Sequence, residues 1–493
     1  MKRWSYVLLL ILSTFQGAQA QMDDFKAFRE QILNDYQDFR KNIMERYVEF
    51  LDAAWTEYET MAGSQRVTIP KPIVAPVYTP PTLPSISQKE NEKPIEETKQ
   101  PVVVTPMEEL PKLPTNPNTP IISTIPEVPS PIVPQIRFLL YGLQLVIPAP
   151  KLEATLYNVK QQEVVAFWKQ IHESDTEACV ESIRQLAVNY RLGDWCTLKA
   201  VEEYCNKWAK DNEIAARVMM QYLMLSMGYD VRLAIADNMA YLLLPFEQKV
   251  YANTYIPINN VRYYIYPNTV PENSSIYSCP IPSNEVCGQK LNLIINPSYL
   301  LPKDEHTFSV SYGGLSVQGS VNKNVIALQQ QYPLMDIHCY AASVADESVK
   351  ESVVKQLSAQ VAGMNEGEAA NALLHFVQNG FKYQTDQQQF GDEVMEKIFF
   401  FDEILYFPYC DCEDRSIFYA YLVRKILGLD VLLVGYPGHE CTAVALSVAP
   451  PSYTSFIYKG KTFYICDPTY IGANIGMCMP NYTNEKPKVE EWY

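Results

Sequence analysis

The chain has 493 residues, enough for two to four domains, and carries 56 acidic against 40 basic side chains, a formal charge of −16. Such an excess of negative charge argues against nucleic acid or an anionic membrane surface as a partner. The 11 cysteines are an odd number, so at least one thiol stays unpaired even if the others form disulfides.

The first residues have the features of an export signal. A charged Met-Lys-Arg start is followed by an apolar run over residues 7–12 and an Ala-Gln-Ala motif that ends at residue 20. This pattern predicts a signal peptide over residues 1–20 and an exported protein, periplasmic or secreted. No later stretch is long and apolar enough to predict a membrane span.

Apolar residues recur every three or four positions over residues 21–66, which predicts one long amphipathic helix. The stripe consists of Phe25, Phe28, Ile32, Tyr36, Phe39, Ile43, Tyr47, Phe50, Ala54 and Tyr58. Two roles stay open for it: self-association or partner binding through the aromatic face, and packing of that face onto the rest of the chain.

A proline-rich segment follows over residues 67–135. It holds 17 of the 35 prolines and no glycine. This composition predicts an extended, semi-rigid linker without a core of its own. We therefore expect it to separate the N-terminal helix from the rest of the chain.

Residues 136–268 are globular in composition and repeat a pattern found 200 positions later. The aligned pairs include Asp211 with Asp411, Glu213 with Glu413, Gly228 with Gly428, Asp230 with Asp430 and Tyr264 with Tyr464. The repeat predicts two copies of one fold. The alternative is a chance similarity between two helix–strand units.

Residues 269–345 alternate apolar and polar side chains and predict a small β-rich module between the two copies. Its expected strands are residues 291–295, 307–312 and 315–319, with Gly313-Gly314 as a turn between the last two.

Residues 346–493 hold the segment that carries chemistry. Cys412 precedes an apolar helix pattern that ends at Gly428, so it is expected at a helix N-terminus. His439 follows a short buried strand, and Asp467 ends another. His439 is the only histidine downstream of Cys412.

These three residue types in this order suit nucleophilic catalysis. A cysteine needs a base to accept its proton, and the base needs a carboxylate to hold its tautomer. The helix N-terminus favours a thiolate at Cys412, and its free N–H groups suit an oxyanion hole. Tyr409 is a further candidate for the oxyanion hole because it lies close to Cys412 in sequence.

Three local motifs resemble the transglutaminase-like family, a branch of the papain-like cysteine hydrolases that includes exported bacterial proteins. They are Asp411-Cys412-Glu413-Asp414, Gly438-His439 and Asp467-Pro468-Thr469, and the resemblance covers roughly residues 368–480. It implies an α+β fold in which the helix bearing the cysteine packs on an antiparallel sheet. It also implies a Cys412–His439–Asp467 triad that acts on a protein or peptide substrate without a cofactor or metal.

The chain departs from the animal crosslinking members of that family. They carry tryptophan after the nucleophile and a longer interval between cysteine and histidine, which here is 439 − 412 = 27 residues. The resemblance therefore implies acyl transfer and leaves the acceptor open. We expect hydrolysis of peptide or amide bonds through a thioester; the alternatives are protein crosslinking and a non-enzymatic peptide-binding or scaffold role.

Three other interpretations of the cysteines are open. Cys410, Cys412, His439 and Cys441 have the residue types of a zinc site. Disulfides are open among Cys279, Cys287, Cys410, Cys441, Cys466 and Cys478. The third interpretation is an inactive copy of the fold.

The first copy is expected to be inactive. Asn212, Met239 and Pro267 stand 200 positions before the three triad residues. None of them can act as thiolate, base or carboxylate, so residues 136–268 are predicted to be a degenerate domain and residues 346–493 the catalytic one.

Overall fold

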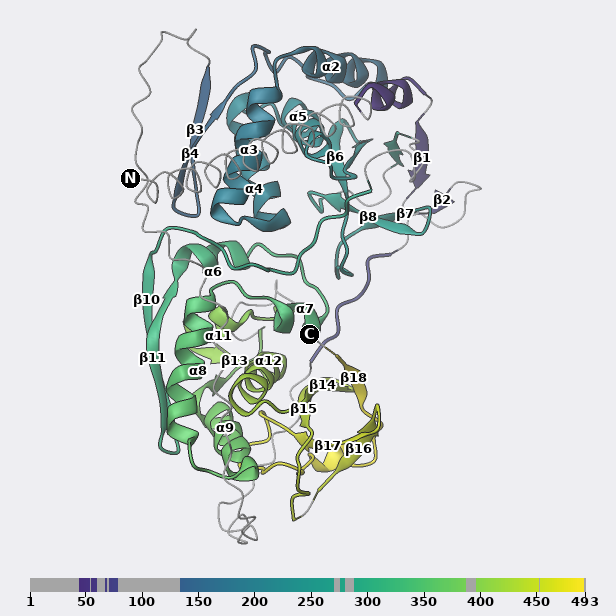
Figure 1. Ribbon diagram of the computed structural model, residues 1–493. Coiled ribbons are helices and arrows are strands. Elements are labelled where there is room, and N and C mark those ends of the chain that lie inside the picture. Colours follow the sequence, from purple (N-terminus) through teal and green to yellow (C-terminus); the bar gives the residue numbers. More distant parts are fainter. Residues whose placement is uncertain are drawn as a thin grey trace, which may run out of the picture.

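The computed structural model describes residues 44–53, 55–59, 67–68, 71–78, 134–269, 275–279, 288–386, 396–451 and 453–491. Helices and mainly antiparallel sheets form two halves, drawn one above the other in Figure 1, which confirms the α+β class. The predicted signal peptide and residues 79–133 of the predicted linker lie outside the described residues. In the described ranges no helix combines the length and apolar character needed to cross a bilayer.

The upper half in Figure 1 joins a hairpin, a helical layer and a sheet. The hairpin is β3 (Gln135–Leu140) with β4 (Leu143–Pro148), and the helices are α2 (Gln161–Glu173), α3 (Glu177–Tyr190), α4 (Gly193–Ala209) and α5 (Glu213–Ser226). The sheet has the order β2-β1-β9-β5-β6-β8-β7. Its strands are β1 (Thr56–Glu59), β2 (Val67–Thr68), β5 (Arg232–Ala236), β6 (Met239–Pro245), β7 (Tyr255–Ile258), β8 (Val261–Tyr266) and β9 (Ser275–Ser278).

The lower half has the same plan. It begins with the hairpin β10 (Glu305–Tyr312) and β11 (Leu315–Asn322). Its helices are α6 (Lys323–Gln329), α7 (Ile337–Ala342), α8 (Glu347–Val361), α9 (Glu366–Gly380), α11 (Phe401–Tyr406) and α12 (Cys412–Leu422), which continues as a π-helical turn (Val423–Leu427). Its sheet has the order β16-β17-β15-β14-β18. The strands are β14 (Val431–Tyr436), β15 (His439–Val444), β16 (Ser455–Tyr458), β17 (Lys461–Cys466) and β18 (Lys488–Glu490), and β12 (Lys382–Tyr383) pairs with β13 (Tyr409–Cys410) outside it.

The strands β9-β5-β6-β8-β7 of the first sheet follow the same order as β18-β14-β15-β17-β16 of the second, and the register of their paired strands is offset by 200 residues. Arg232 pairs with Leu243 as Leu432 pairs with Ala443, and Leu242 pairs with Tyr266 as Thr442 pairs with Cys466. Strands β7 and β8 have the bounds of β16 and β17 less 200. Chance similarity between two local units does not produce matching long-range pairings, so the repeat predicted from sequence extends to the whole sheet.

The predicted β-rich module over residues 269–345 is not a separate unit. Strand β9 adds to the sheet of the first half, while the β10–β11 hairpin packs on α8 and α9 of the second. The hairpin itself and its Gly313-Gly314 turn are confirmed. Residues 291–295 form only isolated bridges, because their backbone partners are short loop segments rather than a sheet edge.

The predicted N-terminal helix is shorter than expected. A helix covers residues 44–51, but Tyr58 lies in β1, which pairs with β9. Tyr47 of the stripe is buried against the first half together with Met44 and Leu51, and Phe50 packs beside them, so this part of the aromatic face packs onto the chain itself. Residues 21–43 lie outside the described range, and self-association through them stays a prediction.

The buried side-chain amide of Gln221 holds the helix over residues 44–51 in place. Gln221 of α5 accepts a hydrogen bond from the Trp168 indole at 2.7 Å and donates to the Tyr47 hydroxyl at 3.0 Å and the Val231 carbonyl at 2.9 Å. Its side chain is fully buried. The four groups satisfy one another without solvent, as buried polar groups must.

We expect Gln221→Leu to lower the free energy of unfolding by about 3 kcal/mol, because it leaves three buried polar partners unsatisfied. Urea denaturation measures the change. Gln185→Leu is the matched control, since Gln185 lies on an exposed face and bonds only Glu181 of its own helix; it should change stability by less than about 0.5 kcal/mol. Equal losses in the two variants would contradict the role of the buried network.

The start of the predicted linker does not simply separate the two parts of the chain. Residues 71–78 run from the first half to the second and end beside the C-terminal sheet (Figure 1). The backbone N–H of Ala252 donates to the Ile73 carbonyl at 2.8 Å, and Ala75 is buried. The proline content gives this segment an extended form, and the two halves supply the surface that covers it.

Candidate active site

Cys412 is the first residue of α12, as the sequence predicts. The helix begins there because Asp411 and Asp414 form a capping box, in which each carboxylate accepts a hydrogen bond from the other residue's backbone N–H. Helix α12 is buried along its whole length and packs on β15. A buried, capped helix start fixes the position of the Cys412 side chain, which is 1% exposed.

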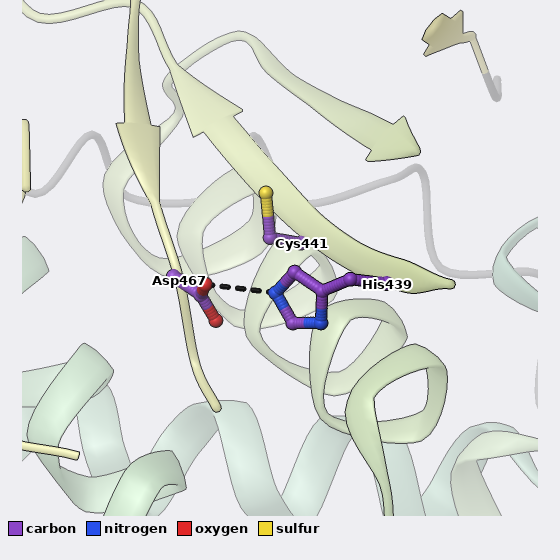
Figure 2. Close-up of side chains that lie close together, drawn as sticks. All are labelled: His439, Cys441 and Asp467. Atoms are coloured by element: carbon purple, nitrogen blue, oxygen red, sulfur yellow. Dashed lines mark hydrogen bonds and ion pairs between the residues drawn. The ribbon is translucent and has the colours of Figure 1, made fainter. Parts of the chain in front are cut away.

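His439 opens β15, and Asp467 directly follows β17. Because β15 and β17 are paired, the two side chains meet, and His439 Nε2 lies 2.8 Å from Asp467 Oδ2 (Figure 2). Both side chains are buried. The other carboxylate oxygen, Oδ1, accepts from the backbone N–H groups of Thr469 and Tyr470, so the carboxylate orientation is fixed by its own loop.

The second nitrogen of the His439 imidazole, Nδ1, is available for another hydrogen bond. His439 Nδ1 is buried and has no hydrogen-bond partner among the described residues. The hydroxyl of Ser416 in α12 bonds the Cys412 carbonyl at 2.7 Å and the Glu440 carbonyl at 3.2 Å. The start of α12 therefore lies against the strand that His439 opens, although no described contact joins the Cys412 sulfur to the His439 ring.

The thiol environment differs from the expected one. The helix N-terminus predicts a lowered pKa, but burial raises the pKa of Cys412 well above its usual value, and the neighbouring Asp411 carboxylate raises it further. The Glu440 N–H and Glu413 act in the opposite direction, with Cys412 Sγ 3.1 Å from Glu413 Oε2. The expectation from the helix dipole alone was wrong because sequence does not show how completely the thiol is buried.

Two side chains that support the triad could not be recognised from sequence. Tyr482 stacks on the His439 ring, with centroids 5.3 Å apart and an interplanar angle of 7°. Gln378 of α9 donates to the backbone carbonyls of Asp467, Tyr470 and Ala473 and so fixes the loop after β17. Both are distant from the triad in sequence, and neither lies in a motif.

Tyr409, the sequence candidate for the oxyanion hole, lies in β13, where the Lys382 ammonium sits 5.8 Å from its ring centroid. No described contact joins it to Cys412. Tyr383 lies on β12, the strand paired with β13, and its burial, together with the nearby Cys412, raises its pKa. Tyr383 replaces Tyr409 as the candidate near the thiol because the pairing of β12 with β13 brings Tyr383 alongside Cys410.

The predicted zinc set is not assembled. Cys410 and Cys412 belong to no group of potential metal ligands in the described chain, and Cys410 instead accepts from Arg415 Nε at 3.5 Å. The group that does form around the histidine consists of His439, Cys441 and Asp467, whose ligand atoms lie within 4.8 Å of one another. In Figure 2 the Cys441 sulfur points away from the ring while Asp467 faces it, the arrangement of a base and its orienting carboxylate.

A second group has the donor atoms for a hard cation. Oxygens of Asp386, Glu396, Asp411 and Glu413 lie within 4.8 Å of one another. Burial raises the pKa of each carboxyl, to about 6 for Asp386 and about 7 for Glu396. Shared protons satisfy such a cluster equally well, so the geometry alone does not select a metal.

The ten described cysteines, all but Cys287, are free thiols. The disulfides considered among Cys279, Cys410, Cys441, Cys466 and Cys478 are therefore not formed in the structure. Nine of the ten are buried, and Cys478 is half-buried.

The equivalent positions of the first half lack this chemistry. Asn212 caps α5 and accepts from the Ala215 N–H at 3.1 Å, Met239 opens β6, and Pro267 follows β8. The backbone frame of the site is thus repeated, whereas the set of cysteine, histidine and aspartate at these positions occurs once in the described residues.

Residues 71–78 reach the site from outside. Burial raises the pKa of Tyr78 well above its usual range, and Glu440, Glu413 and Cys412 raise it further. The end of a segment more than 300 residues upstream of Cys412 in the sequence therefore lies in the same region of the second half.

No family model, no curated protein and no solved structure matches the chain at a significant level. The functional argument therefore depends on the residues and their geometry.

Proposed function

We propose that the chain is an exported thiol acyl-transfer enzyme of transglutaminase-like type, with a papain-like core, that hydrolyses peptide or amide bonds through a thioester on Cys412. One observation carries the proposal: the His439 ring bonds Asp467 through Nε2 and keeps a buried, unpartnered Nδ1 next to the segment that holds Cys412. A base held by a carboxylate on one side and available on the other is what a cysteine nucleophile requires.

In the proposed mechanism, His439 Nδ1 accepts the proton of Cys412, and the sulfur attacks an amide carbonyl. The imidazolium, stabilised by Asp467, then gives that proton to the departing amine, which leaves a thioester. Water, deprotonated by His439, attacks the thioester and releases the acid and the free thiol. In this mechanism, backbone N–H groups at the start of α12 and the Tyr383 hydroxyl would stabilise the oxyanion.

The test is to trap the acyl-enzyme. The full chain is mixed with a complex peptide pool and quenched in acid, and Cys412 is examined by mass spectrometry. We expect an acyl group on Cys412, which also names the substrate, and no adduct on the control thiol Cys196 in α4 of the first half. Adducts spread over several buried cysteines would indicate non-specific chemistry instead.

We expect hydrolysis to exceed amine transfer. Crosslinking must exclude water, present at ~55 M, from the thioester. The aromatic side chains that reach Cys412 or His439 are Tyr78, Tyr383 and Tyr482, whose hydroxyls provide polar contacts for water rather than an apolar wall. A glutamine peptide offered with excess labelled primary amine should give mainly the acid, and an asparagine peptide serves as the control. If the labelled amine is incorporated into the peptide faster than the acid forms, a crosslinking enzyme would be favoured.

The raised pKa of Cys412 favours a second candidate, a non-enzymatic peptide-binding module. A neutral buried thiol is a poor nucleophile unless His439 takes its proton during the reaction. A thiol-directed electrophile separates the two functions: the enzyme should be alkylated at Cys412 at neutral pH, whereas the binding module should not.

A further inference from the structure

Cys441 lies on the same face of the second sheet as His439 and Asp467. His439 and Cys441 are two residues apart on β15, and side chains two apart in a strand point to the same face. Thr442 pairs with Cys466, so the antiparallel register places Asp467 opposite Cys441, one position beyond that pair. The three side chains therefore form a triangle across two neighbouring strands (Figure 2).

The triangle is small and buried. One ligand atom of each residue lies within 4.8 Å of those of the other two, and His439 Nε2 lies 2.8 Å from Asp467 Oδ2. All three side chains are buried, and Cys441 is a free thiol. Metal–ligand bonds of about 2.0–2.3 Å place the ligand atoms of tetrahedral Zn²⁺ about 3.3–3.8 Å apart, so side-chain shifts of about 1 Å bring these atoms to that spacing.

The charges of the three groups suit one divalent cation. Without a metal the Cys441 thiol keeps its proton, because burial and the Asp467 carboxylate raise its pKa well above the usual value. When Zn²⁺ replaces that proton, a thiolate, a carboxylate and a neutral imidazole surround it, and the unit has no net charge. A neutral unit avoids the cost of a buried charge. Sulfur and imidazole ligands select Zn²⁺ over Ca²⁺ and Mg²⁺, which take oxygen ligands.

The first half shows that the fold alone does not require these donors. Met239, Tyr241 and Pro267 stand 200 positions earlier, and β6 pairs with β8 in the same register. Tyr241 is buried in an apolar cluster of its sheet, as Cys441 is in the second half. The shared frame accepts a bulky aromatic side chain at this position, so the combination of thiol, imidazole and carboxylate is specific to the second half.

We propose that His439, Cys441 and Asp467 bind Zn²⁺, with a fourth position for water, and that the bound metal blocks His439 as a base. Coordination through Nε2 leaves the imidazole proton on Nδ1, which then cannot accept a proton from a thiol. The Cys441 proton passes to solvent, and Asp467 exchanges its hydrogen bond for a metal bond. Tyr482, which stacks on the ring and is half-buried, is the side chain that we expect to move when the cation enters. Metal binding is independent of catalysis; only the block of turnover rests on the proposed function.

The first test measures metal binding to the reduced full chain. Co²⁺ is the probe of ligand type, because a thiolate ligand gives a charge-transfer absorption that Zn²⁺ should displace at one equivalent per chain. Cys441→Val, which suits a buried strand, should remove this absorption. It should also weaken Zn²⁺ binding, measured by calorimetry, by at least about tenfold, the effect that even an indirect supporting residue has on metal affinity.

Cys466→Val is the matched control. Cys466 is also buried, but it alternates with Asp467 along the chain and packs into the cluster on the other face of the sheet. It should bind both metals like the parent. Asp467→Asn, which keeps the side-chain volume, tests the same site if Cys441→Val does not fold, and it should also weaken Zn²⁺ binding. Parent-like binding in the folded Cys441→Val or Asp467→Asn chain would overturn the proposal.

A second measurement tests the class of metal. Ca²⁺ and Mg²⁺ in millimolar excess should leave the Co²⁺ absorption intact, because neither competes for a thiolate. Displacement of Co²⁺ by either cation would refute the stated ligand set.

A third measurement connects the metal to turnover. Zn²⁺ should inhibit the parent at concentrations that fill the site, and a chelator should restore activity. The Zn²⁺ concentration that halves turnover should rise at least about tenfold in Cys441→Val, each chain being compared with its own metal-free rate. Saturation of the site without inhibition would overturn the block of His439. If the parent shows no turnover while the Co²⁺ absorption depends on Cys441, the proposed function fails and the metal site stands.

Discussion

Cys412→Ala should abolish thiol-dependent turnover, a loss of at least about 10³-fold, while changing the free energy of unfolding by less than about 1.5 kcal/mol. The activity is lost because Cys412 is the described thiol at the start of α12, whereas the Cys441 sulfur, on the His439 strand, points away from the ring. Stability is kept because alanine retains the helix start, whose capping box belongs to Asp411 and Asp414. Turnover of the substrate found by acyl-enzyme trapping and the thermal midpoint are the two measurements.

Cys410→Ala is the matched control for this result. Cys410 is also buried and lies two residues away, but its sulfur faces the Arg415 guanidinium rather than the His439 segment. Its loss should leave turnover within a few-fold of the parent. Equal loss of turnover in both variants, with folding intact, would favour a joint role for the two thiols and argue against a single nucleophile.

Arg415→Met should cost about 3–5 kcal/mol of stability, the largest single effect on folding that we expect from the described contacts. Arg415 is 1% exposed, and its guanidinium donates to the carbonyls of Phe381 at 2.7 Å, Gln378 at 3.2 Å and Pro468 at 3.4 Å. Methionine fills much of the volume but satisfies none of the three acceptors. Guanidinium chloride denaturation provides the measurement.

The position of Arg415 also links stability to the site. Its contacts tie α12 to the end of α9 and to the loop that carries Asp467, so the same change should move the carboxylate relative to His439 and lower turnover as well. Arg137→Met, on an exposed face of β3, is the control and should change neither quantity appreciably. A small effect in Arg415→Met would show that water replaces the lost donors.

The triad could be predicted from sequence because its signals are local. A helix start at Cys412, a strand opening at His439 and a carboxylate following a strand at Asp467 are each set by a few neighbouring residues, and β-pairing then brings His439 and Asp467 together. The repeat was also visible, since residues of one strand register recur at a fixed offset.

The remaining features depend on contacts that leave no local pattern. Tyr78 and Tyr482 reach the site from a proline-rich segment and from the C-terminal region, and composition alone assigned the first to a linker. The thiol pKa depends on burial by the whole half, so a helix terminus alone gave the wrong sign. The β-rich module was misassigned because strand character does not show which sheet a strand joins.

The order in which the chain is synthesised affects when residues 71–78 can make their contacts. They are made 334 residues before Cys412, counting 412 − 78, and long before the second half can fold. Contacts of such separation carry a high cost of loop closure and form late. We therefore expect residues 71–78 to settle against the second half as a late step of folding, after the sheet of that half has formed.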